Sequence, residues 1–123
     1  MFDPFHFEQI LSENSLQFLF YKIIQQNSLL KQYNITLESL SSFVREISQG
    51  YFKENPFHNQ VHIVDSLQGL HYLLKIGNVK KYLRKHDLLA AVTACLIHDF
   101  EHPGYSNQFV IRTKHPLAIR YSD

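Results

Sequence analysis

Residues 88–97 read LLAAVTACLI and are followed directly by His98 and Asp99. A helix that is apolar on nearly every face is typical of an element buried in the centre of a domain. Asp87 stands just before this stretch, where an acidic side chain predicts an N-cap. We therefore expect a central helix whose end presents an imidazole and a carboxylate side by side.

Two segments nearer the N-terminus have apolar residues at helical spacing. The stripes are Leu16, Leu19, Phe20, Ile23 and Ile24 in the first segment, and Leu37, Leu40, Phe43, Val44 and Ile47 in the second. Asn14 and Ser15 are candidate caps for the first helix and Thr36 for the second, while Gly50 suits the position that follows a helix C-terminus. Both segments predict amphipathic surface helices.

The rest of the chain also favours helices. A further helix is expected from about His58 to Lys75, with a stop at Gly77-Asn78. A loop is expected around Pro103-Gly104, and Pro116 can open a last helix. Because no alternating strand pattern or hairpin dipeptide competes with these signals, the sequence predicts an all-α fold, a compact multi-helix domain.

The composition excludes several classes of partner. Twelve Lys and Arg against eleven Asp and Glu give a formal charge of +1, so no strong field favours nucleic acid or an anionic membrane. No stretch approaches the roughly 20 apolar residues of a membrane span. One cysteine, Cys95, cannot form an internal disulfide and is expected to be a small core residue. These features predict a cytoplasmic protein whose partners are small molecules or proteins.

Histidines and aspartates concentrate in two places. On a helix, His58, His62 and Asp65 would share one face, at i, i+4 and i+7. His98 and Asp99 are adjacent, and His102 follows them. Nitrogen and oxygen ligands without thiolate suit Zn²⁺, Mn²⁺ or Fe²⁺ with a harder Mg²⁺ beside it. The spacing alone supports a metal site and a set of unrelated solvated side chains about equally.

Three stretches resemble motifs of the class I 3′,5′-cyclic nucleotide phosphodiesterase catalytic domain. Residues 55–68, NPFHNQVHIVDSLQ, resemble N-P-Y-H-N-x-x-H-x-x-D-V-x-Q, with Phe57 in place of Tyr. Residues 98–107, HDFEHPGYSN, match H-D-x-x-H-P-G-x-x-N without a gap. Residues 117–123, LAIRYSD, look like L-A-x-x-Y-N-D, with Ser122 in place of Asn. The resemblance implies the phosphodiesterase or HD-like helical fold, with residues 1–123 as the first part of a catalytic domain truncated at its C-terminus.

The resemblance also implies roles for individual residues. His58 corresponds to the general acid that protonates the O3′ leaving group, and both His58 and Asp99 would contact the substrate. His62, His98 and Asp99 correspond to ligands of a tightly held ion, usually Zn²⁺, and Asp99 also reaches a second ion, usually Mg²⁺ or else Mn²⁺. His102 would hold a water of that second site. The expected cofactors are therefore two divalent metal ions.

The function implied is hydrolysis of cAMP, cGMP or both to 5′-nucleotides in cyclic-nucleotide signalling. The family's last aspartate ligand and its purine-binding glutamine have no counterpart in residues 1–123, so weak metal binding and little or no hydrolysis are expected from the chain alone. One alternative is a truncated, non-catalytic helical module that binds metal or protein. Another is an HD-type phosphohydrolase that acts on a different phosphoester, which the H-P-G-x-x-N extension disfavours.

Overall fold

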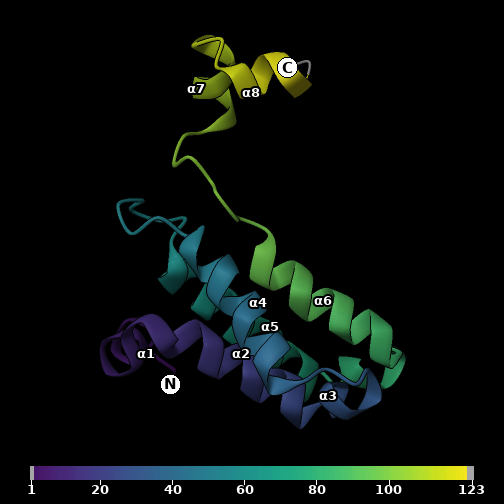
Figure 1. Ribbon diagram of the computed structural model, residues 1–123. Helices are drawn as coiled ribbons and strands as arrows, with labels where there is room; N and C mark the ends of the chain where they lie inside the picture. The colour runs from purple at the N-terminus through teal and green to yellow at the C-terminus, as the bar shows by residue number, and fades with distance from the viewer. Residues whose placement is uncertain (1, 122–123) are drawn as a thin grey trace.

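The computed structural model describes residues 2–121, and every regular element within them is a helix (Figure 1). The α-helices are α1 (Pro4–Leu11), α2 (Ser15–Gln26), α3 (Leu29–Gln32), α4 (Leu37–Gln49), α5 (Gln60–Ile76), α6 (Lys85–Ile97), α7 (Asn107–Arg112) and α8 (Pro116–Tyr121). Short 3₁₀ turns occupy Ser12–Asn14 and Val79–Tyr82. The all-α prediction is confirmed. Ser122 and Asp123, the end of the third motif, lie outside the described residues.

The core forms where α2 packs against α1, α4, α5 and α6, and where α5 packs against α6. Its fully buried side chains include Leu16, Phe20, Ile23 and Ile24 of α2, Val44 of α4, Ile63, Val64 and Leu67 of α5, and Leu88, Val92 and Leu96 of α6. Burial of this apolar surface is the main favourable term in folding the bundle. The predicted stripe of α2 is confirmed, whereas that of α4 is covered only in part, because Leu37 and Phe43 remain exposed.

Helix α6 is less enclosed than its sequence predicts. Leu88, Val92 and Leu96 face the bundle, but Ala94 and Ile97 are exposed. The expectation of a helix buried on all sides is therefore wrong for the described residues. Asp87 is not the N-cap residue either: α6 begins at Lys85, and Asp87 instead takes part in a capping box, in which its carboxylate accepts a hydrogen bond from the backbone N–H of the N-cap residue Arg84 at 3.1 Å.

Other helix boundaries follow local capping. Thr36 caps α4 as predicted, since its hydroxyl oxygen accepts from the backbone N–H of Ser39 at 3.1 Å. Helix α5 begins two residues later than expected, at Gln60, because the Asn59 side chain accepts from the first free N–H groups of the helix. His58 consequently lies in the preceding loop.

Gly50 has a different role from the predicted one. It ends α4 with a φ of −82°, so it does not need the left-handed freedom of glycine. A Cβ at this position would lie 2.3 Å from the ring of Phe100. The missing side chain therefore makes room for the segment that follows α6 to approach the end of α4.

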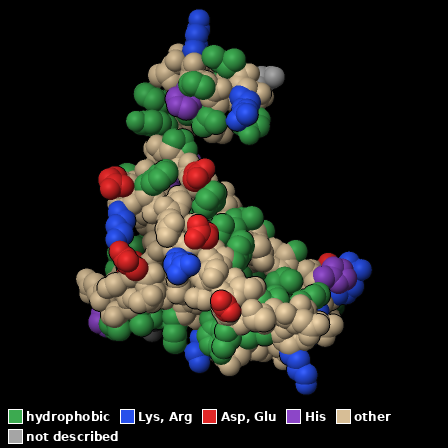
Figure 2. Space-filling view, in the orientation of Figure 1, with side chains coloured by type: hydrophobic (Ala, Val, Ile, Leu, Met, Phe, Trp, Pro, Cys, Tyr) green, Lys and Arg blue, Asp and Glu red, His purple; other side chains and the backbone are tan. Residues whose placement is uncertain are grey.

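Helices α7 and α8 form a hairpin that stands apart from the bundle (Figure 1), and in the space-filling view only a narrow neck joins the two (Figure 2). Within the hairpin, only Ala118 is buried. Helices α1, α3 and α7 were not predicted from the sequence, although Asp3 and Ser106 are ordinary N-caps for α1 and α7. No helix in residues 2–121 is both long enough and apolar enough to cross a membrane.

Candidate metal centre

The first turn of α5 and the end of α6 lie together at one end of the bundle and bring two histidines to one aspartate. His62 projects from α5, while His98 caps the C-terminus of α6 and Asp99 follows it. The Nε2 atom of His62 and the Nε2 atom of His98 each lie 3.3 Å from Oδ2 of Asp99. Two imidazole nitrogens therefore converge on one carboxylate oxygen. We call His62, His98 and Asp99 the helix-end trio.

The hydrogen bonding of His98 fixes what its Nε2 atom can do. Its Nδ1 atom lies 2.9 Å from the backbone carbonyl oxygen of Cys95, which can only accept, so the proton is assigned to Nδ1. In the neutral ring, Nε2 is then a lone pair directed at Asp99. A lone pair and a carboxylate repel unless a proton or a cation lies between them. The trio therefore suits a cation.

The environment of His62 also favours a neutral imidazole ring. Burial lowers the pKa of His62, and although the Asp99 carboxylate acts in the opposite direction, the lowering dominates. The ring of Phe57 packs against it, with the ring centres 4.5 Å apart. A neutral imidazole is the form that binds a metal ion.

His58 and His102 lie beside the trio on two loops. Their rings are stacked, with centres 3.8 Å apart and planes inclined by 18°. One potential ligand atom from each of His58, Asp99 and His102 lies within 4.8 Å of the others, as is also true of the trio. Asp99 thus belongs to both groups. We call His58 and His102 the loop pair.

His102 has the opposite tautomer from His98. Its Nδ1 atom accepts a hydrogen bond from the backbone N–H of Gly104 at 3.0 Å, so in the neutral ring the proton is on Nε2. An Nε2–H group donates to a water or an oxyanion and cannot bind a metal ion directly. This geometry fits the expected task of holding a water.

Two further polar residues of the matched motifs, Asp65 and Asn107, line hollows beside the site. Asp65 is exposed and belongs to neither cluster, although it lines a hollow of about 230 Å³ next to His62. The shared face predicted for His58, His62 and Asp65 is wrong because His58 is not on the helix. Asn107 begins α7 and lines a separate hollow of about 220 Å³ with His102.

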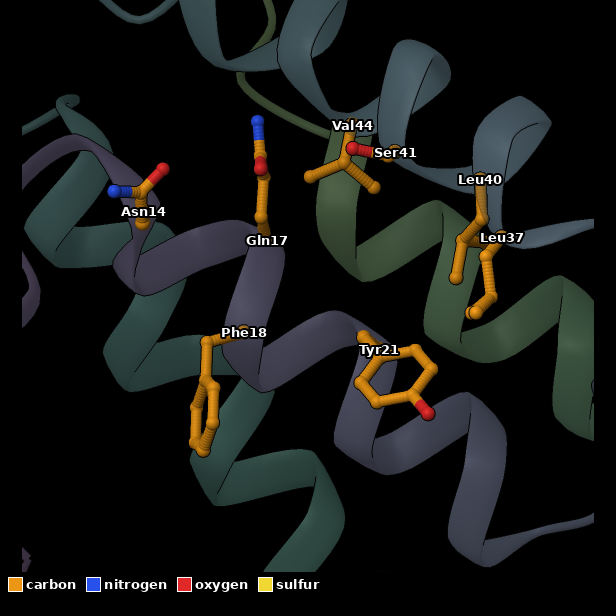
Figure 3. Close-up of a pocket in the computed structure, with 8 residues that line it drawn as sticks. All are labelled: Asn14, Gln17, Phe18, Tyr21, Leu37, Leu40, Ser41 and Val44. Atoms are coloured by element: carbon orange, nitrogen blue, oxygen red, sulfur yellow. The ribbon is translucent and has the colours of Figure 1, made fainter.

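An apolar hollow lies elsewhere in the bundle. It measures about 470 Å³ and lies between α2 and α4, and its lining includes Phe18 and Tyr21 of α2 and Leu37 and Val44 of α4 (Figure 3). No histidine or carboxylate lines it. Its walls offer no imidazole or carboxylate to bind a metal ion, so the chemistry is assigned to the histidines and the aspartate at the ends of α5 and α6.

Comparison with known proteins agrees with the motifs. A sequence model of the family described as 3′5′-cyclic nucleotide phosphodiesterase matches residues 57–123. The chain is 36% identical over 123 residues to the mouse (Mus musculus) dual specificity calcium/calmodulin-dependent 3′,5′-cyclic nucleotide phosphodiesterase 1C, which covers 99% of the chain and 17% of that protein. It is 33% identical over 122 residues to the 3′,5′-cyclic-AMP phosphodiesterase 4 of Dictyostelium discoideum, covering 99% of the chain and 12% of that protein.

A third relative is the human (Homo sapiens) dual specificity calcium/calmodulin-dependent 3′,5′-cyclic nucleotide phosphodiesterase 1B, 37% identical over 124 residues, or 99% of the chain and 23% of that protein. The chain therefore spans less than a quarter of the length of these curated relatives. Most of each relative has no counterpart in the residues compared.

Proposed function

Since the chain belongs to the 3′,5′-cyclic nucleotide phosphodiesterase family, we propose that it supplies the acid histidine and part of a two-metal site for the hydrolysis of cAMP, cGMP or both to 5′-nucleotides. It forms part of a catalytic domain in this proposal. A reducing compartment such as the cytoplasm suits a chain whose single cysteine has no internal disulfide partner.

The helix-end trio is the proposed site of the first ion. The convergence of two Nε2 atoms on Oδ2 of Asp99, each at 3.3 Å, is the observation that carries the proposal. A nitrogen and oxygen donor set of this kind suits Zn²⁺. Asp99 is shared with the second ion, for which Mg²⁺ or Mn²⁺ is the proposed occupant. Such ions, when bound, supply positive charge opposite the anionic phosphodiester and make water a better nucleophile.

In the loop pair, His58 donates a proton and His102 holds a water. The departing O3′ alkoxide is strongly basic, so a positioned acid must protonate it, and we assign this step to the imidazolium of His58. His102 holds a water through Nε2–H, which its bond from Gly104 makes a donor. The stack of the two rings keeps acid and water-holding group at one face of Asp99.

The test combines metal binding with hydrolysis. Zn²⁺ binding to the purified chain is measured by calorimetry, and cAMP and cGMP turnover is measured with Zn²⁺ and Mg²⁺ present. His62→Ala should strongly weaken the binding of Zn²⁺, whereas His58→Ala should leave that binding unchanged and remove any turnover. The matched control is His86→Ala, which changes an exposed histidine at the far end of α6.

Each outcome separates the alternatives. Zn²⁺ binding that His62→Ala does not weaken would refute the trio. A folded chain that binds Zn²⁺ through the trio but hydrolyses neither nucleotide would favour the non-catalytic module for the chain by itself. Turnover of another phosphoester, with none of cAMP or cGMP, would favour the HD-type phosphohydrolase.

A further inference from the structure

Asn55 belongs to the loop that carries His58 and bonds across to the loop that carries His102. Its side-chain nitrogen Nδ2 donates to the backbone carbonyl oxygen of His58 at 3.2 Å and to that of His102 at 2.8 Å. Both partners are carbonyls that can only accept, so the amide group must turn its nitrogen toward them. The side chain of Asn55 thereby joins the backbone of His58 to that of His102, which lies 47 residues after Asn55 in the sequence.

Asn55 is itself fixed at its other edges. Its backbone carbonyl accepts from Nδ2 of Asn59 at 2.8 Å, and Oδ1 of Asn59 caps α5 by accepting from Val61 N–H at 3.0 Å. On the opposite side lies Gly104, with a φ of +79°, where a Cβ would come within 2.5 Å of Oδ1 of Asn55. The amide is therefore anchored to the start of α5 and fits against a residue that has no side chain.

The remaining contacts of the two loops show what depends on Asn55. The segment after α6 has another tether, because Glu101 N–H donates to the carbonyl of Gly50 at 3.0 Å. That bond holds the part of the loop nearer Asp99. Among the described hydrogen bonds, only those of Asn55 tie the backbone of His102 to the loop of His58.

We infer that Asn55 is a positioning residue that clamps the loops of His58 and His102 together and so maintains the stack of their two rings. It acts through two carbonyl groups and touches neither a metal ligand side chain nor the reacting atoms. The consequence for catalysis rests on the proposed function, but the clamp itself is a property of the chain. Removing it should loosen the loop pair and leave the helix-end trio in place.

Asn55→Asp is the sharpest variant, because it keeps the shape of the side chain and removes both donors. In a chain labelled with ¹³C at histidine, the nuclear Overhauser contacts between the rings of His58 and His102 should be lost. Zn²⁺ affinity, measured by calorimetry, should change by less than about threefold, because the trio does not depend on Asn55. In turnover, where it is detectable, kcat should fall by about 10–100-fold, the range typical of groups that orient ligands, with little change in KM.

Asn14→Asp makes the same chemical change at an exposed position with no side-chain cap hydrogen bond, and it should preserve both the ring contacts and the affinity. In Gly104→Ala, the added methyl group would collide with the side-chain amide of Asn55, so this variant should also lose the contacts between the rings of His58 and His102. If Asn55→Asp fails to fold, two other measurements test the clamp. They are the ring contacts in Gly104→Ala and the rate of exchange of the Asn55 side-chain amide protons in the unmodified chain. Slow exchange is expected for those protons.

Persistence of the ring contacts in Asn55→Asp would overturn the clamp. Equal loss of the ring contacts and of Zn²⁺ binding would also overturn it, because Asn55 would then support the whole site. If the unmodified chain does not bind Zn²⁺, the proposed function fails, and the ring contacts still test the clamp by themselves.

Discussion

The two halves of the histidine cluster are supported in different ways. His62, His98 and Asp99 stand at the ends of α5 and α6, next to Ile63 and Leu96, which are completely buried. His58 and His102 stand on loops, and among the described hydrogen bonds the backbones of these two residues are joined by one amide group, that of Asn55. The packed core of the bundle places the first group, and individual polar contacts place the second.

This difference separates stability from function. A buried core residue makes many contacts, so the position of the helix-end trio should shift only when a change also lowers the free energy of unfolding. The net contribution of one hydrogen bond to the free energy of unfolding is only about 0.5–1.5 kcal/mol, so the loop pair can be displaced without unfolding the bundle. The predictions below test this contrast in order of decreasing effect.

Leu96→Ala should have the largest effect. It creates a cavity under the last turn of α6, where the side chain is 0% exposed, and should lower the free energy of unfolding by about 2–5 kcal/mol. Urea denaturation followed by circular dichroism measures this. The control is Leu73→Ala, whose side chain is 60% exposed and whose loss should change stability by less than about 0.5 kcal/mol. Equal effects of the two substitutions would mean that α6 does not pack as described.

Asp99→Asn should have the next largest effect, because Asp99 is the one residue common to both groups. The amide keeps the shape but removes the negative charge, so Zn²⁺ affinity should fall by more than about 100-fold, or about 2.7 kcal/mol. Calorimetric titration of Zn²⁺ measures the change. Asp65→Asn removes an exposed carboxylate outside both groups and should leave the affinity within about twofold. A similar loss of Zn²⁺ affinity in Asp65→Asn would mean that the Zn²⁺ site includes Asp65.

Most of the bundle could be predicted from its pattern of apolar residues. The stripe of α2, the cap at Thr36 and the start of α8 at Pro116 all follow from spacing and capping chemistry, and the structure confirms them. The boundary of α5 was missed because Asn59, rather than a residue before His58, satisfies the free N–H groups. Because the helix begins two residues later than predicted, His58 is not part of it, and the prediction that His58, His62 and Asp65 share one helix face is wrong.

The site could be predicted as a set of residues but not as an arrangement. The motifs identify the histidines and Asp99, whereas the stack of His58 on His102 depends on contacts between residues 47 positions apart. The tautomers of His98 and His102 depend on backbone groups that no side-chain pattern reveals. Burial of α6 was overestimated because an apolar sequence specifies which faces can be covered, not which faces are covered within the described residues.

Tyr51→Phe should have a smaller effect on stability and a clear dependence on pH. The Tyr51 hydroxyl, which is buried, donates to the carbonyl of Leu96 at 2.6 Å, so the variant leaves that carbonyl without its partner at a cost of about 1–3 kcal/mol. Burial raises the pKa of Tyr51 above its ordinary value near 10. The stabilisation is therefore fully present below about pH 10 and is lost as the pH rises above it, because the unfolded state releases the proton first.

Denaturation midpoints from pH 7 to pH 11 test this. The unmodified chain should lose stability at the alkaline end more steeply than Tyr51→Phe, so the two curves should converge. Zn²⁺ affinity at pH 7 should change little, since the core still holds α6. Parallel curves would show that the Tyr51 hydroxyl is accessible to solvent.

Asp87→Asn should have the smallest effect, and it acts at the end of α6 remote from the trio. A side-chain hydrogen bond from Arg84 lowers the pKa of Asp87 to about 2. A lowered pKa means that its contribution is present above the ordinary value near 3.9 and disappears as the pH falls through about 2. The melting temperatures of the unmodified chain and the variant should therefore differ slightly at pH 6 and converge near pH 2. Because α6 runs on from Asp87 to His98, about 16 Å of helix separates the two residues, and Zn²⁺ affinity should be unchanged. A loss of affinity in Asp87→Asn would mean that the trio depends on fraying at the start of α6, and the contrast between the core-supported trio and the hydrogen-bonded loop pair would fail.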